Sequence, residues 1–86
     1  MYSYRFGWDK KKNEELKSED RPSFEDVVEV IADQGVVKED KNPNHQDQLI
    51  FVVMIDGYPH VVSFEIRGDI FWLIRVYPAR KYEKEI

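Results

Sequence analysis

The chain has 86 residues, a mass of 10.3 kDa and a net charge of −4, with 42% hydrophobic and 14% aromatic residues. A chain of this size and apolar content predicts a single domain over residues 1–86 with one small core, and excludes a disordered or low-complexity polymer. The absence of cysteine excludes a disulfide framework, thiolate zinc sites and thiol catalysis. Because no apolar run is long enough to cross a bilayer and the start lacks a signal-peptide pattern, we expect a cytoplasmic protein without membrane contact.

Charge is distributed unevenly along the chain. Acidic side chains concentrate in residues 13–40, whereas residues 1–12 and 67–86 carry an excess of Lys and Arg. The pI near 5.1 argues against nonspecific nucleic-acid binding through total charge. If the two basic ends meet in space, however, they form a cationic patch on an acidic body.

The start of the chain predicts a short strand followed by a helix. Large and small side chains alternate from Tyr4 to Trp8, which is the period of a strand. Asp9 is a residue type that caps helices, and the helix-forming run Lys10–Ser18 follows it. Leu16 is the only apolar residue of that run, so we expect an exposed helix with little to bury.

A second helix is predicted from residue 24 to the glycine at position 35. Ser23 can cap this helix, and Asp26 completes a capping-box pattern. Gly35 is the residue type that ends a helix in the left-handed conformation. The apolar residues with the spacing of one helix face are Phe24, Val27, Val28 and Ile31.

The middle of the chain predicts a short strand, a long loop and a buried strand. Val36 and Val37 are assigned to the short strand, and the polar run 38–47 around Asn42-Pro43-Asn44 to the loop. Leu49–Ile55 is an unbroken apolar run rich in β-branched residues, which indicates a central strand buried on both faces.

The last third predicts two further strands, so that three long strands form a meander. Asp56-Gly57 is a hairpin turn, and the chain returns over His60–Ile66 with alternating polarity. After a second turn, Ile70–Tyr77 forms the third long strand, which Pro78 ends. Residues 79–86 form a short charged helix or tail, and the whole order indicates an α+β fold with the helices on one sheet face.

Several segments, in this order and spacing, resemble the BrnT family of bacterial toxins. The opening Phe6-x-Trp8-Asp9-x-x-Lys12-Asn13 and the helix start Ser23-Phe24-Glu25-Asp26-Val27-Val28 are similar to two family patterns. The hairpin Ile50-Phe51-Val52-Val53-x-Ile55-Asp56-Gly57-Tyr58 is similar to that of one branch of the family. The segment Arg75-Val76-Tyr77-Pro78-Ala79-Arg80-Lys81 resembles the final strand and the signature after it.

This resemblance implies a RelE-like α+β fold with a short N-terminal strand, two helices and then an antiparallel sheet of three to four strands. It also implies a ribonuclease that cuts RNA and inhibits translation, neutralised by a BrnA-like antitoxin whose ribbon-helix-helix portion binds operator DNA. The chain departs from the family at Glu19-Asp20-Arg21, where a Lys-His-Gly segment is usual.

The residue types themselves point to candidates for RNA cleavage without a metal or other cofactor. Attack by the 2′ oxygen needs a proton acceptor, cations that stabilise the phosphorane and a donor for the leaving oxygen. Arg75, Arg80 and Lys81 are the catalytic candidates, because a guanidinium fork matches phosphate oxygens and an ammonium adds charge. We expect Arg75 to share a face with Leu73, Phe71 and Tyr77, and the alternative is an arginine that only reaches solvent or pairs with the acidic helices.

Candidate RNA-binding residues come from both ends of the chain. The candidates are the run Lys10, Lys11 and Lys12, together with Trp8 and Tyr77, whose rings can stack on bases. The alternative is a solvated lysine face and aromatic side chains in the core. We expect Trp8 to be exposed and Trp72 to be buried.

The histidines and glycines give weaker evidence of a functional site. His60 is the candidate general acid or base, although a strand-start histidine is more often a rim residue. His45 lacks further ligands at fixed spacing, so no metal site is predicted. Gly7, Gly35, Gly57 and Gly68 are interpreted as isolated turn residues, which excludes a phosphate loop.

The sequence therefore favours a toxin ribonuclease, with a catalytically inactive RelE-like binding module as the alternative. Apolar surface is left over, because the helices are too few to cover both faces of the predicted sheet. We expect an antitoxin segment to cover the sheet face or a groove at Arg75 and Arg80, with a homodimer that shares this surface as the alternative.

Overall fold

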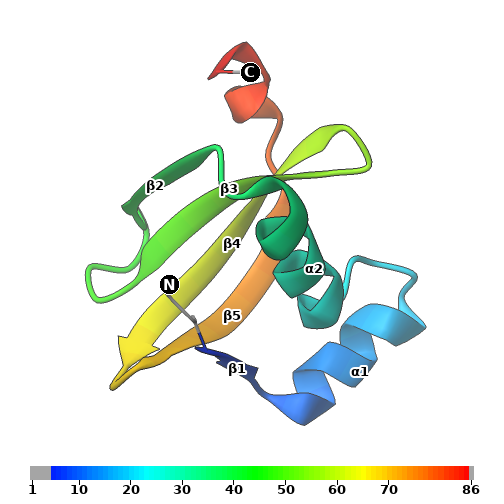
Figure 1. Cartoon of the computed structure of the whole chain (residues 1–86), viewed down its shortest axis with the longest axis vertical. Coiled ribbons are helices and arrows are strands. Elements are labelled where there is room, and N and C mark those ends of the chain that lie inside the picture. Colours follow the sequence, from blue (N-terminus) through cyan, green and yellow to red (C-terminus); the bar gives the residue numbers. More distant parts are fainter. Residues whose placement is uncertain (1–4, 86) are drawn as a thin grey trace.

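The computed structural model describes residues 5–85 and contains a five-stranded mixed sheet with two α-helices (Figure 1). The α+β class is confirmed, but the sheet has more strands than the three to four expected. The sequence order is β1 (Arg5–Trp8), α1 (Lys10–Ser18), α2 (Phe24–Gln34), β2 (Lys38–Lys41), β3 (Leu49–Ile55), β4 (Tyr58–Arg67), β5 (Ile70–Pro78) and a 3₁₀ helix η1 (Arg80–Glu85). Tyr4, the expected start of the first strand, lies outside the described residues.

The strands lie in the order β1-β5-β4-β3-β2. Strands β2 to β5 are antiparallel neighbours, whereas β1 runs parallel to β5 and pairs Arg5 with Ile70 through Trp8 with Leu73. A parallel pair needs a long crossover, which here is most of the chain. Within the described residues no helix is both long and apolar enough to cross a membrane.

Strand β2 lies where a loop was predicted, and the expected strand at Val36 and Val37 is wrong. Both valines are exposed, and only the Val37 amide reaches the sheet, donating to the Val52 carbonyl at 2.7 Å. The pairing continues through Lys38–Lys41, which has no apolar side chain and so no alternation to detect. A short charged strand at a sheet edge also discourages pairing with other chains.

The predicted caps hold both helices. The Asp9 carboxylate accepts from the Lys12 amide at 3.0 Å, and Ser23 forms the predicted capping box with Asp26. Gly35 lies at the C-terminal end of α2 with φ 77°. Helix positions and ends are therefore set by local side-chain chemistry.

Buried Asn13 joins α1 to the start of α2. Its Oδ1 accepts from the Phe24 amide at 2.8 Å, and its Nδ2 donates to Glu25 at 2.9 Å. The Lys17 ammonium contacts the same Glu25 carboxylate at 2.7 Å. Helix α1, which brings only Leu16 to the apolar core, is thus attached through a polar side chain that satisfies a helix N-terminus.

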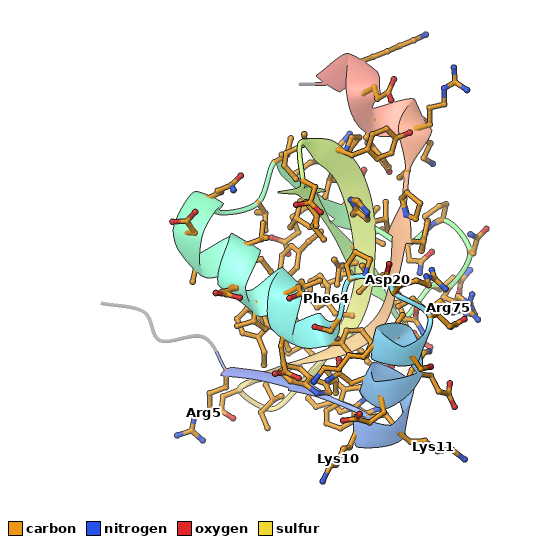
Figure 2. All side chains as sticks on the ribbon, turned by 90° about the vertical axis from the view of Figure 1, so that its right-hand side faces the viewer. Arg5, Lys10, Lys11, Asp20, Phe64 and Arg75 are labelled. Carbon is orange, nitrogen blue, oxygen red and sulfur yellow. The ribbon has the colours of Figure 1, made fainter. Side chains whose placement is uncertain are left out.

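The sheet has two different faces. The helix face packs under α1 and α2 and holds the main core; in Figure 2 its central residue Phe64 is labelled. The second face carries a smaller cluster, in which Ala79, just before η1, and Tyr82 of η1 cover Ile50, Val52 and Val61. The helices therefore leave the second face to η1 and to solvent.

A bulge in β5 changes the face on which Arg75 lies. Phe64 pairs with Leu73, but the preceding residue, Ser63, pairs with Arg75, so β5 contains one extra residue at this point. Directly paired residues project to the same face. Arg75 therefore shares the second face with Ser63 and Tyr77, and the expectation that it lies on the face of Leu73 and Phe71 is wrong.

Both tryptophans are partly buried, so the expectations of an exposed Trp8 and a buried Trp72 are both wrong. Trp8 stacks on buried Phe24 with ring centroids 6.0 Å apart, so it packs against the core. Trp72 is half-buried, with the Arg67 guanidinium 4.5 Å from its ring centroid. Its ring also approaches Gly7, where a Cβ would be 2.9 Å from a ring carbon. Gly7 is thus a strand residue required by close packing, not a turn residue.

Gly7→Ala is expected to lower the free energy of unfolding by about 1–3 kcal/mol, because the added methyl group overlaps the Trp72 ring. Chemical denaturation measures the change. In a Trp72→Leu background the same substitution should cost much less, and an equal cost in both backgrounds would contradict the proposed clash.

Asn13→Ala is expected to destabilise the chain by about 1–3 kcal/mol, because the buried Phe24 amide loses its acceptor. Asn44→Ala, at an exposed loop position, is the control and should change stability by less than about 0.5 kcal/mol.

The Asn13→Ala variant should also change the pKa of the Glu25 carboxyl group. The Lys17 hydrogen bond, and then that from Asn13, hold the pKa of Glu25 below its ordinary value. The stability that this depressed pKa contributes is present above the unfolded-state pKa and is lost as the pH falls through the folded-state pKa. In Asn13→Ala the Glu25 pKa should rise, as NMR titration of the carboxyl carbon can measure; an unchanged pKa would exclude Asn13 as a cause.

Candidate functional site

A cleft of about 570 Å³ lies beside the part of β5 that β1 does not cover. Strand β1 stops pairing at Leu73, and beyond it the Arg21 guanidinium donates to the Val76 carbonyl at 3.1 Å. The wall comes from α1 and the loop after it, from β4 and β5, and from the connection between β2 and β3. Segments distant in the sequence therefore meet at this edge. We call it the cationic cleft.

The charge of the cationic cleft has one sign. Its lining includes Lys12, Arg21, His45 and Arg75 and no carboxylate, in a chain whose net charge is −4. The remaining lining residues are Asn42, Asn44, Gln48, Ser63 and Tyr77, which are polar, and Leu16 and Val76, which are apolar. A concave site lined by one sign of charge concentrates ions of the opposite sign, so the cleft favours anions.

Arg75 is the most available cation of the cleft. It is exposed, and in the part of the chain that the structure describes it makes no hydrogen bond or ion pair. Its cross-strand neighbour Ser63 is only 2% exposed, and the Ser63 hydroxyl has no hydrogen-bond partner. An exposed guanidinium thus stands opposite a buried hydroxyl, and neither is used by the fold.

Residues 42–48 form a structured rim. The Asn42 backbone amide donates to the Gln48 carbonyl at 3.0 Å, and its side-chain amide donates to Gln48 Oε1 at 3.2 Å. Asn42 Oδ1 in turn accepts from the Asn44 amide at 2.9 Å. His45 is exposed within this ordered segment, which holds its imidazole at the cleft.

The structure brings only part of the predicted site together. Arg75, Lys12 and Tyr77 line the cationic cleft, whereas Lys10 and Lys11 extend from the start of α1 away from Arg75 (Figure 2). Trp8, a predicted base-stacking residue, is partly buried against Phe24 and does not line the cleft.

Arg80 and Lys81 are exposed on η1 and do not line the cleft. Lys81 lies with its ammonium 5.1 Å from the Tyr82 ring centroid. Desolvation raises the pKa of Tyr58, the Glu83 carboxylate raises it further, and Arg80 opposes the shift. Arg80 therefore lies near Tyr58 at the start of β4, outside the lining of the cleft.

His60 is buried on the helix face, where it pairs with core residue Val53. Its Nδ1 lies 2.8 Å from the Tyr58 carbonyl. His60 and Arg75 thus occupy opposite faces of the sheet, so the structure does not bring this acid or base candidate to the cleft. His45 lines the cleft instead, and no local pattern marks it, because the position of the β2–β3 connection depends on the order of the strands in the sheet.

A second hollow, of about 830 Å³, lies beside α2 and has the opposite charge. Its acidic lining residues are Asp20, Asp26, Glu29, Asp33 and Asp56. Arg21 lines both hollows and separates them. Among residues 5–85 no group of three or more His, Asp or Glu side chains is arranged to hold a metal ion.

Comparisons of the chain with protein-family models, with curated proteins and with solved structures give no significant match.

Arg75→Ala is expected to weaken binding of a short single-stranded oligonucleotide, used as a polyanionic probe, about tenfold, because a charge-assisted contact is lost. Lys81→Ala removes one charge outside the cleft and should change affinity less than about twofold. Fluorescence anisotropy at fixed salt measures both. Equal losses in the two variants would mean that total charge, not the cleft, determines binding.

Proposed function

We propose that the chain is a metal-independent endoribonuclease that acts as the cytoplasmic toxin of a type II toxin–antitoxin system, in the manner of the BrnT family and its RelE-like fold. The observation that carries this proposal is the cationic cleft, which gathers Lys12, Arg21, His45 and Arg75 without a carboxylate. An acidic chain that concentrates its bases in one concave site is suited to a polyanionic substrate such as RNA.

The lining residues supply the groups that RNA cleavage needs. The 2′ oxygen loses its proton and attacks the phosphorus; the bond to the 5′ oxygen breaks, that oxygen takes up a proton, and a 2′,3′-cyclic phosphate remains. Arg75 and Arg21 stabilise the charge on the phosphorane. His45, rather than His60, is the general acid or base, because it is the histidine that lines the cleft.

Two further cleft residues bind the substrate in this proposal. Lys12 contributes a charge to a neighbouring phosphate, and Tyr77, 37% exposed, offers its ring to a base. Arg80 and Lys81, on η1, contact more distant phosphates of a longer RNA. Inhibition of translation then follows from cleavage of cellular RNA.

The proposed partner is a BrnA-like antitoxin of the ribbon-helix-helix type, which carries the operator DNA contacts of the complex. The supporting feature is the second sheet face, which has no α-helix over it and leaves Trp72 half-buried and Tyr77 exposed. An antitoxin segment laid over this face also closes the cationic cleft. A homodimer that shares this surface is the alternative arrangement.

A second candidate function is a binding module of the same fold without chemistry. The observation that favours it is the placement of His60 on the opposite face and of Asp20 in the acidic hollow next to Arg21. In that case the cationic cleft holds RNA and leaves it intact.

RNA incubated with the purified chain in EDTA is expected to yield fragments that end in 2′,3′-cyclic phosphate. Arg75→Ala should lower the cleavage rate by about 10²-fold or more, because a contact made in the transition state is lost, and His45→Ala by a similar factor. His60→Asn is the matched control and should retain the rate. Gel electrophoresis and end-group analysis measure the products, and RNA that is bound but not cut would establish the binding module instead.

A further inference from the structure

Ser63 has a buried hydroxyl that the fold does not satisfy. The residue is 2% exposed, and its Oγ has no hydrogen-bond partner. Buried hydroxyl groups in folded chains are almost always hydrogen-bonded, since the contacts with water that they lose must be replaced. An alanine would fill nearly the same space without this cost, so packing in the fold does not explain a serine at this position.

The position of Ser63 supplies that explanation. The residue lines the cationic cleft and lies directly across the ladder from Arg75, at the bulge. The Arg75 guanidinium has no partner among the described residues, so it can reorient without losing an interaction. A hydroxyl donor and a guanidinium fork side by side form a pair suited to a tetrahedral oxyanion.

We propose that Ser63 is a phosphate-binding residue, whose hydroxyl donates to a non-bridging oxygen of a phosphate that the Arg75 guanidinium also holds. This assignment rests on the proposed function, because it names the subsite that receives the phosphate of the RNA chain. The Ser63 oxygen is closed to water, so side chains of the cleft move as the phosphate enters and the hydroxyl gains its partner on binding.

Replacing Ser63 should weaken phosphate binding without lowering the stability of the chain. Ser63→Ala removes an unsatisfied hydroxyl, so the melting temperature of the ligand-free chain should stay the same or rise. The same change should weaken binding of inorganic phosphate about tenfold, the value of one hydrogen bond to a charged group. Ser18→Ala is the matched control, because Ser18 is exposed on α1 and its hydroxyl donates to the Glu15 carbonyl, outside the cleft.

Phosphate binding is measured by NMR titration of the full chain, with the amide signals of residues 63 and 75 as reporters, and by thermal melting with and without phosphate. An oligonucleotide with 2′-deoxyribose throughout, which the proposed chemistry cannot cleave, forms the second arm. Binding of both probes through Ser63 supports a subsite for the phosphates of nucleic acid, whereas binding of free phosphate alone limits the subsite to small anions and overturns its link to RNA.

Two results would overturn the role of Ser63 itself: phosphate affinity equal in wild type and Ser63→Ala, or a lower melting temperature of that variant without phosphate, which indicates a structural hydroxyl. Ser63→Cys, which keeps the branching of the side chain but replaces the hydroxyl with a slightly larger and weakly donating thiol, should bind phosphate as poorly as the alanine variant. These outcomes are separable from the proposed function. Wild-type cleavage with unchanged phosphate binding in Ser63→Ala removes only the subsite, and phosphate binding without cleavage removes only the enzyme.

Discussion

The extra residue in β5 determines how the core and the cationic cleft can share one strand. Without it, Leu73 and Arg75 would lie on one face, because strand side chains alternate with a period of two. The bulge lets Leu73 and Val76 both face the helices, while Arg75 turns to the other side. A charged side chain is thereby placed in a strand whose neighbours are core residues, without burying its guanidinium.

The attachment of α1 through a polar side chain also positions residues of the cationic cleft. Asn13 and the Ser23 capping box fix the angle between the helices, and the loop between them carries Arg21 to the Val76 carbonyl. Lys12, on the neighbouring turn of α1, then lines the cleft. A helix with almost no apolar face is thus held by specific hydrogen bonds, and its Lys12 is left for the anion.

Local signals in the sequence predicted the helices and the long strands, because caps, turns and apolar runs act over a few residues. The remaining features depend on pairing between distant segments. Nothing near Ile74 marks a bulge, so a strict alternation assigned Arg75 to the wrong face. Strand β2 carries only charged residues, and its pairing follows from its neighbour β3. The positions of His45 and His60 follow from that same sheet order, which is why the sequence favoured the histidine that does not reach the cleft.

The parallel pairing of β1 with β5 has a consequence for the order in which the fold forms. The antiparallel strands β3, β4 and β5 close short loops, so they can associate early, whereas Arg5 cannot find its partner Ile70 until most of the chain is in place. During synthesis on the ribosome, β1 therefore cannot pair until β5 has been made. Because Lys12 of α1 and Arg75 of β5 both line the cationic cleft, the cleft is completed only after β5 has emerged, and a nascent chain carries no assembled anion site beside the ribosomal RNA.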